Sequence, residues 1–178
     1  PRAAQRGQRG GQRTLKNAGA TALLVIILYA LQTSILPLIA YHGVTADLML
    51  LFVTSTAFLK GARVGALSGF AVGVLQDIAS GTFLGVNAFT RVLIGFCVGK
   101  FSDQVFKEQV FLPVFASLLV TTVNYFILAL LMILLGYRFN LMGHMQYTLL
   151  PMLIYQLAFA YPVHHLAYEL DKRYGKKA

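Results

Sequence analysis

Charged residues are scarce in this sequence, and cysteine is almost absent. Charged residues make up 12% of the chain, whereas soluble domains average about 25%. Hydrophobic residues make up 57% of the 178 positions. A soluble chain of this length could not bury so much apolar surface, so the composition predicts a multi-spanning membrane protein. The single cysteine, Cys97, excludes an intramolecular disulfide and a cysteine-based metal cluster.

Catalytic and cofactor-binding motifs are missing as well. The sequence has no nucleophile elbow, no His-Glu-x-x-His zinc motif and no carboxylates paired at a fixed spacing. The stretch GFCVGK at residues 95–100 has one residue too few between its glycines for a phosphate loop, and Phe101 stands where Ser or Thr is needed. His164 and His165 are adjacent, so on a helix they point about 100° apart and do not easily share a metal. We therefore expect no enzyme, no cofactor and no metal site.

Six apolar stretches match, or nearly match, the length of a bilayer-spanning helix. They cover residues 18–40, 47–59, 62–77, 83–99, 110–135 and 145–168. Pro162 falls inside the last stretch, where we expect a kink. The sequence thus divides into a basic cytoplasmic tail over residues 1–17, expected to be disordered, a transmembrane domain over 18–171, and a second basic tail over 172–178. In an alternative division, the second and third stretches form one interrupted segment that does not cross.

The basic residues favour six spans with both ends inside. In that topology thirteen of the fifteen Lys and Arg residues lie on the cytoplasmic side, and only Arg91 and Arg138 do not. Merging the second and third stretches would place Lys60 and Arg63 within the membrane. The net charge of +9 is therefore explained by topology, and the basic N-terminal tail either serves as a topology anchor or contacts anionic lipid or an acidic partner. Nucleic-acid binding is not supported, because the N-terminal tail has no aromatic residue for stacking on bases.

Glycines recur every four residues in the third stretch, and the fourth stretch ends with two more at the same spacing. Residues four apart lie on one face of a helix, and small residues in membrane helices mark close packing. We expect a helix-packing face made of Gly61, Gly65, Gly69, Gly73, Gly95 and Gly99. Folded as an antiparallel hairpin, the two stretches would pair Gly61 with Gly99, Gly65 with Gly95, Gly69 with Arg91, and Gly73 with Asn87.

Four polar residues at membrane depth are candidates for structural or partner-binding roles: Asp77, Asn87, Arg91 and Asn124. Asp77 follows Gly73 in the four-residue series. The hairpin register separates Asp77 and Arg91 by about two turns, or roughly 12 Å in rise, so an ion pair between them is possible without being required. Asp77 could instead bond to Asn87, to backbone amides of the turn or to another protein, or face water. Arg91 could instead bond to Asn87 or to backbone carbonyls inside the bundle.

The run GFAVGVLQDIASGTFLGVNAF, residues 69–89, resembles the signature region of the bacterial rod-shape-determining protein MreD family. The family pattern is a glycine-rich helix ending in aspartate, a short serine/glycine turn and a leucine-glycine pair. The elements of the pattern are here Gly69, Gly73, Asp77, Ser80, Gly81, Leu84 and Gly85. Residues 45–48 also resemble the start of the family's second span, with Ala46 where a proline often stands. The resemblance in layout covers residues 18–174.

The resemblance implies an all-α protein of the bacterial inner membrane, with a helical arrangement similar to the substrate-binding subunits of energy-coupling-factor vitamin transporters. It implies a non-catalytic scaffold in the complex that elongates rod-shaped cells. The partners it implies are the membrane helix of MreC, the RodA peptidoglycan polymerase with its transpeptidase partner, and, indirectly, MreB filaments.

A vitamin-binding transporter subunit is the alternative function. An enclosed outer-side cavity lined by the polar residues, Gln156 among them, would favour the transporter. An exposed apolar groove that holds a foreign helix would favour the scaffold. Ala18 and Ala22 form one small-xxx-small pair that a partner helix could use, but a partner could equally use the glycine face or the last span.

Overall fold

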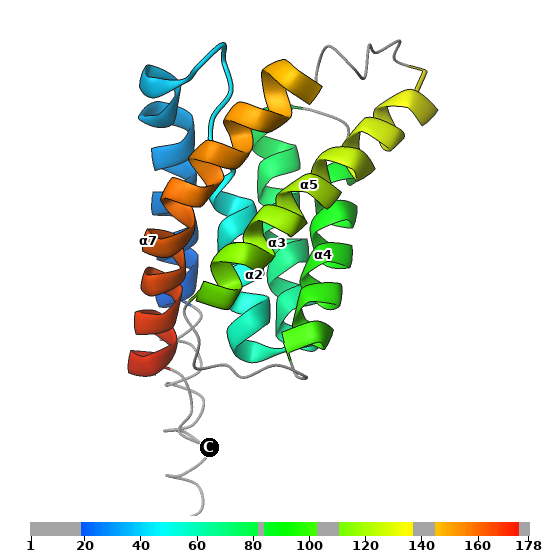
Figure 1. The fold of residues 1–178 in the computed structure, drawn as a ribbon. Helices are drawn as coiled ribbons and strands as arrows, with labels where there is room; N and C mark the ends of the chain where they lie inside the picture. The colour runs from blue at the N-terminus through cyan, green and yellow to red at the C-terminus, as the bar shows by residue number, and fades with distance from the viewer. Residues whose placement is uncertain (1–18, 82–83, 103–110, 137–144, 175–178) are drawn as a thin grey trace, which may run out of the picture.

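The computed structural model describes residues 19–81, 84–102, 111–136 and 145–174. In this part of the chain the regular elements are all helices, and an isolated bridge joins Tyr41 to Val44. An N-terminal helix over residues 19–34 leads into η1 (Leu36–Ile39). The following elements are α2 (Leu48–Lys60), α3 (Ala62–Ser80), α4 (Val86–Ser102), α5 (Phe111–Leu134), η2 (Met145–Leu149) and α7 (Leu150–Tyr174) (Figure 1). The prediction of an all-α fold is confirmed.

Helices occupy the six apolar stretches that the sequence predicted. The expected first residue of the fourth stretch, Phe83, and the basic N-terminal tail lie outside the described residues. α7 continues through Lys172 and Arg173 to Tyr174, so the C-terminal tail expected from residue 172 begins as helix. Pro162 lies inside α7, which changes direction along its length (Figure 1), as an internal proline favours.

Two helices in the described chain are long and apolar enough to cross a membrane. They are Gly19–Ile39, with a mean hydropathy of 2.3, and Pro113–Leu134, with a mean hydropathy of 2.2. α2 is also apolar but has only 13 residues. The other helices do not meet this test: α4 has only 17 residues, and α3 and α7 carry more polar residues.

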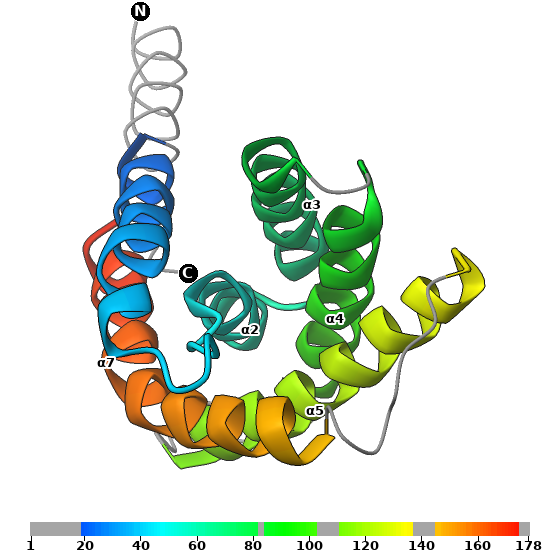
Figure 2. The same ribbon diagram turned by 90° about the horizontal axis from the view of Figure 1, so that it is seen from above.

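α2 lies at the centre of the molecule. Seen from above, the N-terminal helix, α7, α5, α4 and α3 are arranged around it (Figure 2). From Leu48 to Phe58 all of its residues are buried. A helix with neighbours on most sides has no polar face to present to solvent, which explains why α2 is apolar around its circumference.

Candidate functional site

The α3–α4 hairpin packs backbone against backbone through its glycines. A Cβ added at Gly65 or Gly69 would overlap the carbonyl oxygen of Gly95 or Arg91, respectively. At Gly73 an added Cβ would overlap the backbone of Ala88. From the other side, Cβ atoms at Gly95 and Gly99 would overlap the backbone of α3 at Gly65 and Ala62. These contacts have the register that the four-residue spacing predicts.

Gly61 has a different role from the one expected of it. It is not part of α3 but forms the junction between α2 and α3, with φ of 83° in the left-handed region that favours glycine. A Cβ added at Gly99 would lie 2.5 Å from the carbonyl carbon of Gly61. Gly61 thus lies opposite Gly99, as the hairpin register requires, but as a turn residue that lets α3 begin immediately after α2.

Asp77 caps the beginning of α4 from the end of α3. Its carboxylate accepts hydrogen bonds from the backbone N–H groups of Gly85 at 2.9 Å, Asn87 at 3.1 Å and Ala88 at 3.1 Å. The side-chain amide of Asn87 donates a further bond of 2.9 Å. Asp77 is fully buried, and the first turn of a helix has N–H groups without intrahelical partners. The carboxylate therefore satisfies those groups and closes the hairpin, while its negative charge lies at the positive end of α4.

Arg91 pairs with Asp47, which lies 44 positions earlier in the chain. Its Nη2 donates a bond of 2.7 Å to Asp47 Oδ2. The Arg91 side chain is 2% exposed and that of Asp47 is 12% exposed. Because α3 packs so closely on the α4 backbone at Arg91, the long side chain extends to α2 instead. The two opposite charges offset each other in an interior where an unpaired charge would be costly.

Asp47 is also the N-cap of α2 and a junction between helices. Its Oδ1 accepts a bond of 2.9 Å from the N–H of Leu50. Gln156 of α7 bonds to both sides of the Asp47 backbone, accepting from its N–H at 3.0 Å and donating to its carbonyl at 3.3 Å. Gln32 of the N-terminal helix accepts a bond of 3.2 Å from the N–H of Met49. We call Asp47, Arg91, Gln156 and Gln32 the Asp47 cluster; it joins the N-terminal helix, α2, α4 and α7.

Asn124 lies apart from the Asp47 cluster along the sequence and on another helix. It is 4% exposed on α5, three residues after the buried Thr121 and seven after Ser117, which places the three on one helix face. The hydroxyls of Thr121 and Ser117 each bond to a backbone carbonyl of their own helix. This polar face of α5 is thus directed into the bundle.

The polar contacts described above hold helices together and do not resemble a catalytic site. The carboxylates of Asp47 and Asp77 are both engaged with fixed donors, so neither is held ready to accept a substrate proton. In the described ranges no three His, Cys, Asp or Glu side chains gather as metal ligands. Three grooves in the described part of the chain, at α2–α3, α4–α5 and α2–α7, are lined by residues other than Asp77, Asn87, Arg91, Asn124 and Gln156.

The sequence reasoning missed Asp47 as the partner of Arg91. A signal for the pair was present, because the chain has only six acidic residues. Of these, only Asp47 and Asp77 lie at the same predicted ends of the spans as Arg91, and Asp77 is two turns away in the hairpin. A buried arginine needs a counterion, so elimination pointed to Asp47.

The family model for the rod shape-determining protein MreD matches residues 13–172 of the chain. The chain belongs to the MreD family. Membership assigns the protein to bacterial rod-shape determination, and MreD is a shape-determining family, not an enzyme family. The glycines, Asp77 and the Asp47 cluster all fall within the matched residues.

No curated protein and no solved structure matches the chain. The likeness to transporter substrate-binding subunits therefore stays a prediction. The run that resembles the family signature lies in the α3–α4 hairpin, where Gly69 and Gly73 make close backbone contacts and Asp77 caps α4.

Proposed function

We propose that this MreD-family chain crosses the bacterial inner membrane six times, with both ends in the cytoplasm, and is a non-catalytic scaffold of the cell-elongation complex. The family match over residues 13–172 carries the proposal. The distribution of Lys and Arg supports the topology. So do the large apolar side chains on the outer surface, such as Leu67, Leu119 and Leu130, which are 57% to 70% exposed.

The polar interior supports a scaffold over a small-molecule carrier. A carrier needs polar groups directed into a cavity, whereas Asp47, Asp77, Asn87, Arg91 and Gln156 bond to one another or to backbone. These bonds fix helices in place. These contacts favour the scaffold over the vitamin-transporter alternative.

The proposed partner surface is the outward face of the N-terminal helix. Only 11% of the apolar window of this helix is buried, against 28% for α5. Between Gly19 and Ala30 its exposed positions form a continuous stripe that includes small residues: Gly19, Ala22, Leu23, Ile26, Ile27 and Ala30. Ala22 and Ile26, at one edge of this stripe, also line a groove between the N-terminal helix and α3. Small residues let a second membrane helix approach closely. Ala22 is exposed on this stripe, and Ala18, its expected companion, lies outside the described residues.

We propose that the membrane helix of MreC packs on this stripe. Through MreC, the chain would connect to RodA with its transpeptidase partner and, indirectly, to MreB. A photo-crosslinking residue at position 23 tests this in cells that express the tagged protein. The matched control is position 119 on α5, because Leu23 is 60% and Leu119 67% exposed. We expect crosslinks to MreC from position 23 and not from 119; crosslinks to MreC from 119 alone would contradict the proposed surface.

A further inference from the structure

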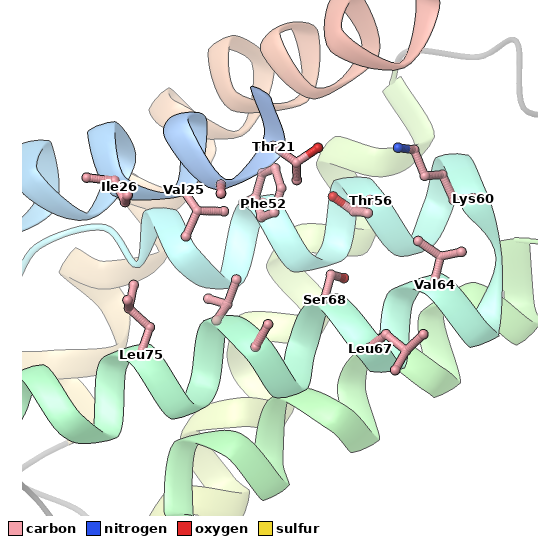
Figure 3. A pocket seen from close by; sticks show the side chains of 13 residues that line it. Thr21, Val25, Ile26, Phe52, Thr56, Lys60, Val64, Leu67, Ser68 and Leu75 are labelled. Carbon is pink, nitrogen blue, oxygen red and sulfur yellow. The ribbon is translucent and has the colours of Figure 1, made fainter. Parts of the chain in front are cut away.

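A groove of about 580 Å³ runs between the N-terminal helix and α3, with α2 as its floor (Figure 3). Its walls include exposed apolar side chains, with Ile26 at 57% and Leu67 at 70% exposure. The interior of the groove is much less accessible, since Phe52 on the α2 floor and Val72 on the α3 wall are each 2% exposed. A flexible acyl chain is much thinner than an α-helix, which is about 10–12 Å across with its side chains, and it could lie between the apolar walls over this floor.

The groove is polar at one end and apolar at the other (Figure 3). The end near the α2–α3 junction carries the ammonium of Lys60, together with the hydroxyl groups of Thr21 and Thr56. The opposite end is lined by Val25, Ile26 and Leu75. A site with a cation at one end and hydrocarbon walls along the rest matches a molecule with an anionic head and an apolar tail.

Lys60 is able to bind an additional anion. Its Nζ lies 3.4 Å from Asp171 Oδ1, and the side chain is 36% exposed. An ammonium group has three N–H donors, so one carboxylate does not saturate it. Arg63, three residues further on, is also exposed, which adds a second positive charge at this end.

We propose that the groove binds one anionic phospholipid, with its phosphate at Lys60 and one acyl chain along the apolar walls. This rests on the proposed topology, which places Lys60 at the cytoplasmic surface. Anionic headgroups concentrate on that leaflet, and basic pockets between membrane helices bind them. The acyl chain then extends from the headgroup region toward the membrane centre, in the direction that the apolar part of the groove takes.

The test is native mass spectrometry of the delipidated full-length protein titrated with phosphatidylglycerol or with phosphatidylcholine of the same chains. We expect phosphatidylglycerol to bind more tightly. Lys60→Gln should weaken it about fivefold, as removal of roughly 1 kcal/mol per basic residue implies. The matched control is Lys100→Gln, which removes an exposed lysine in the last turn of α4 and should leave binding unchanged. Lys60→Arg should retain binding, which separates loss of charge from misfolding.

Ala71→Phe tests the apolar part of the groove separately, because Ala71 lines it and the larger ring would occupy the chain's position. We expect this variant to lose phosphatidylglycerol with Lys60 intact. Equal binding of both lipids, or weakening by Lys60→Gln without weakening by Ala71→Phe, would overturn the proposal. Equal binding of both lipids would mean that the groove has no headgroup preference, or that it takes the side chains of a partner. Weakening by Lys60→Gln alone would mean that Lys60 attracts the lipid at the surface and that the groove does not hold an acyl chain. Since the assay contains no partner protein, its failure is distinct from failure to recover MreC.

Discussion

Asp47 and Arg91 form an ion pair inside the bundle, between the start of α2 and α4. Within the described residues Arg91 Nε and Nη1 have no hydrogen-bond partner, so the bond from Nη2 to Asp47 is the guanidinium's connection to the protein. Removal of one member of a buried ion pair leaves the other charge uncompensated. The two charges should therefore behave as a unit, because each offsets the other.

We expect Asp47→Asn and Arg91→Met each to lower the free energy of unfolding by about 3–5 kcal/mol. Asn preserves the N-cap of α2, so that variant isolates the loss of charge. The double variant should lose clearly less than the sum, because neither charge is then left alone. Denaturant titration of the purified protein in detergent micelles measures all three. Strictly additive losses would show that the two side chains do not interact energetically.

Removal of the Asp77 carboxylate should lower the free energy of unfolding more than removal of an exposed carboxylate. Asp77→Leu would leave the N–H groups of Gly85, Asn87 and Ala88 without their acceptor, and each buried unsatisfied donor costs about 1–3 kcal/mol. We expect a loss of about 3 kcal/mol or more and a lower thermal midpoint. The control, Glu169→Gln, removes an exposed i,i+4 partner of Arg173 and should cost at most about 1 kcal/mol. Equal effects of the two variants would argue against the capping role.

Among the helices, α3 and α4 show how much of a fold a short pattern can predict. Four-residue spacing predicts the face and the register of the hairpin, because both follow from helix periodicity and a short connection. The role of Gly61 could not be predicted this way, since the pattern does not show where α2 ends. The Asp47–Arg91 pair is harder still, because it spans 44 positions and depends on how non-adjacent helices pack.

The glycine contacts predict that a single methyl group disrupts the hairpin. Gly69→Ala would place a Cβ against the backbone of α4 at Arg91, so we expect separation of the helices and a loss of about 1–3 kcal/mol. Gly19→Ala is the control, since nothing lies within 4 Å of a Cβ there. It should be neutral or stabilising by up to about 1 kcal/mol. Thermal unfolding in detergent compares them; a Gly69→Ala protein as stable as Gly19→Ala would contradict the close packing.

For the molecule as a whole, the central position of α2 was beyond the sequence. An evenly apolar helix of 13 residues has no face that points to a particular neighbour, so periodicity cannot orient it. The charge asymmetry, in contrast, acts on the whole chain at once and gives a definite topology. Topology is therefore the feature of the complete molecule that the sequence predicts most directly.

The predicted topology can be checked with single cysteines in a Cys97→Ala background. Tyr41 lies in a predicted outer loop and is 59% exposed. Arg173 lies near the predicted cytoplasmic end of α7, and its side chain is 74% exposed. A membrane-impermeant maleimide added to cells from which the outer membrane has been removed should label Tyr41→Cys directly. It should label Arg173→Cys only after the inner membrane is permeabilised. The reverse labelling would contradict six spans with both ends inside.

The most direct test of the scaffold proposal is to purify the tagged full-length protein from membranes in mild detergent and identify co-purifying proteins by mass spectrometry. The scaffold function predicts recovery of MreC together with RodA. It also predicts that Asp77→Leu and Arg91→Met reduce this recovery in proportion to their loss of stability, since both act inside the bundle and not at the partner surface. Recovery of an ATP-driven transport module in place of MreC and RodA would contradict the scaffold function.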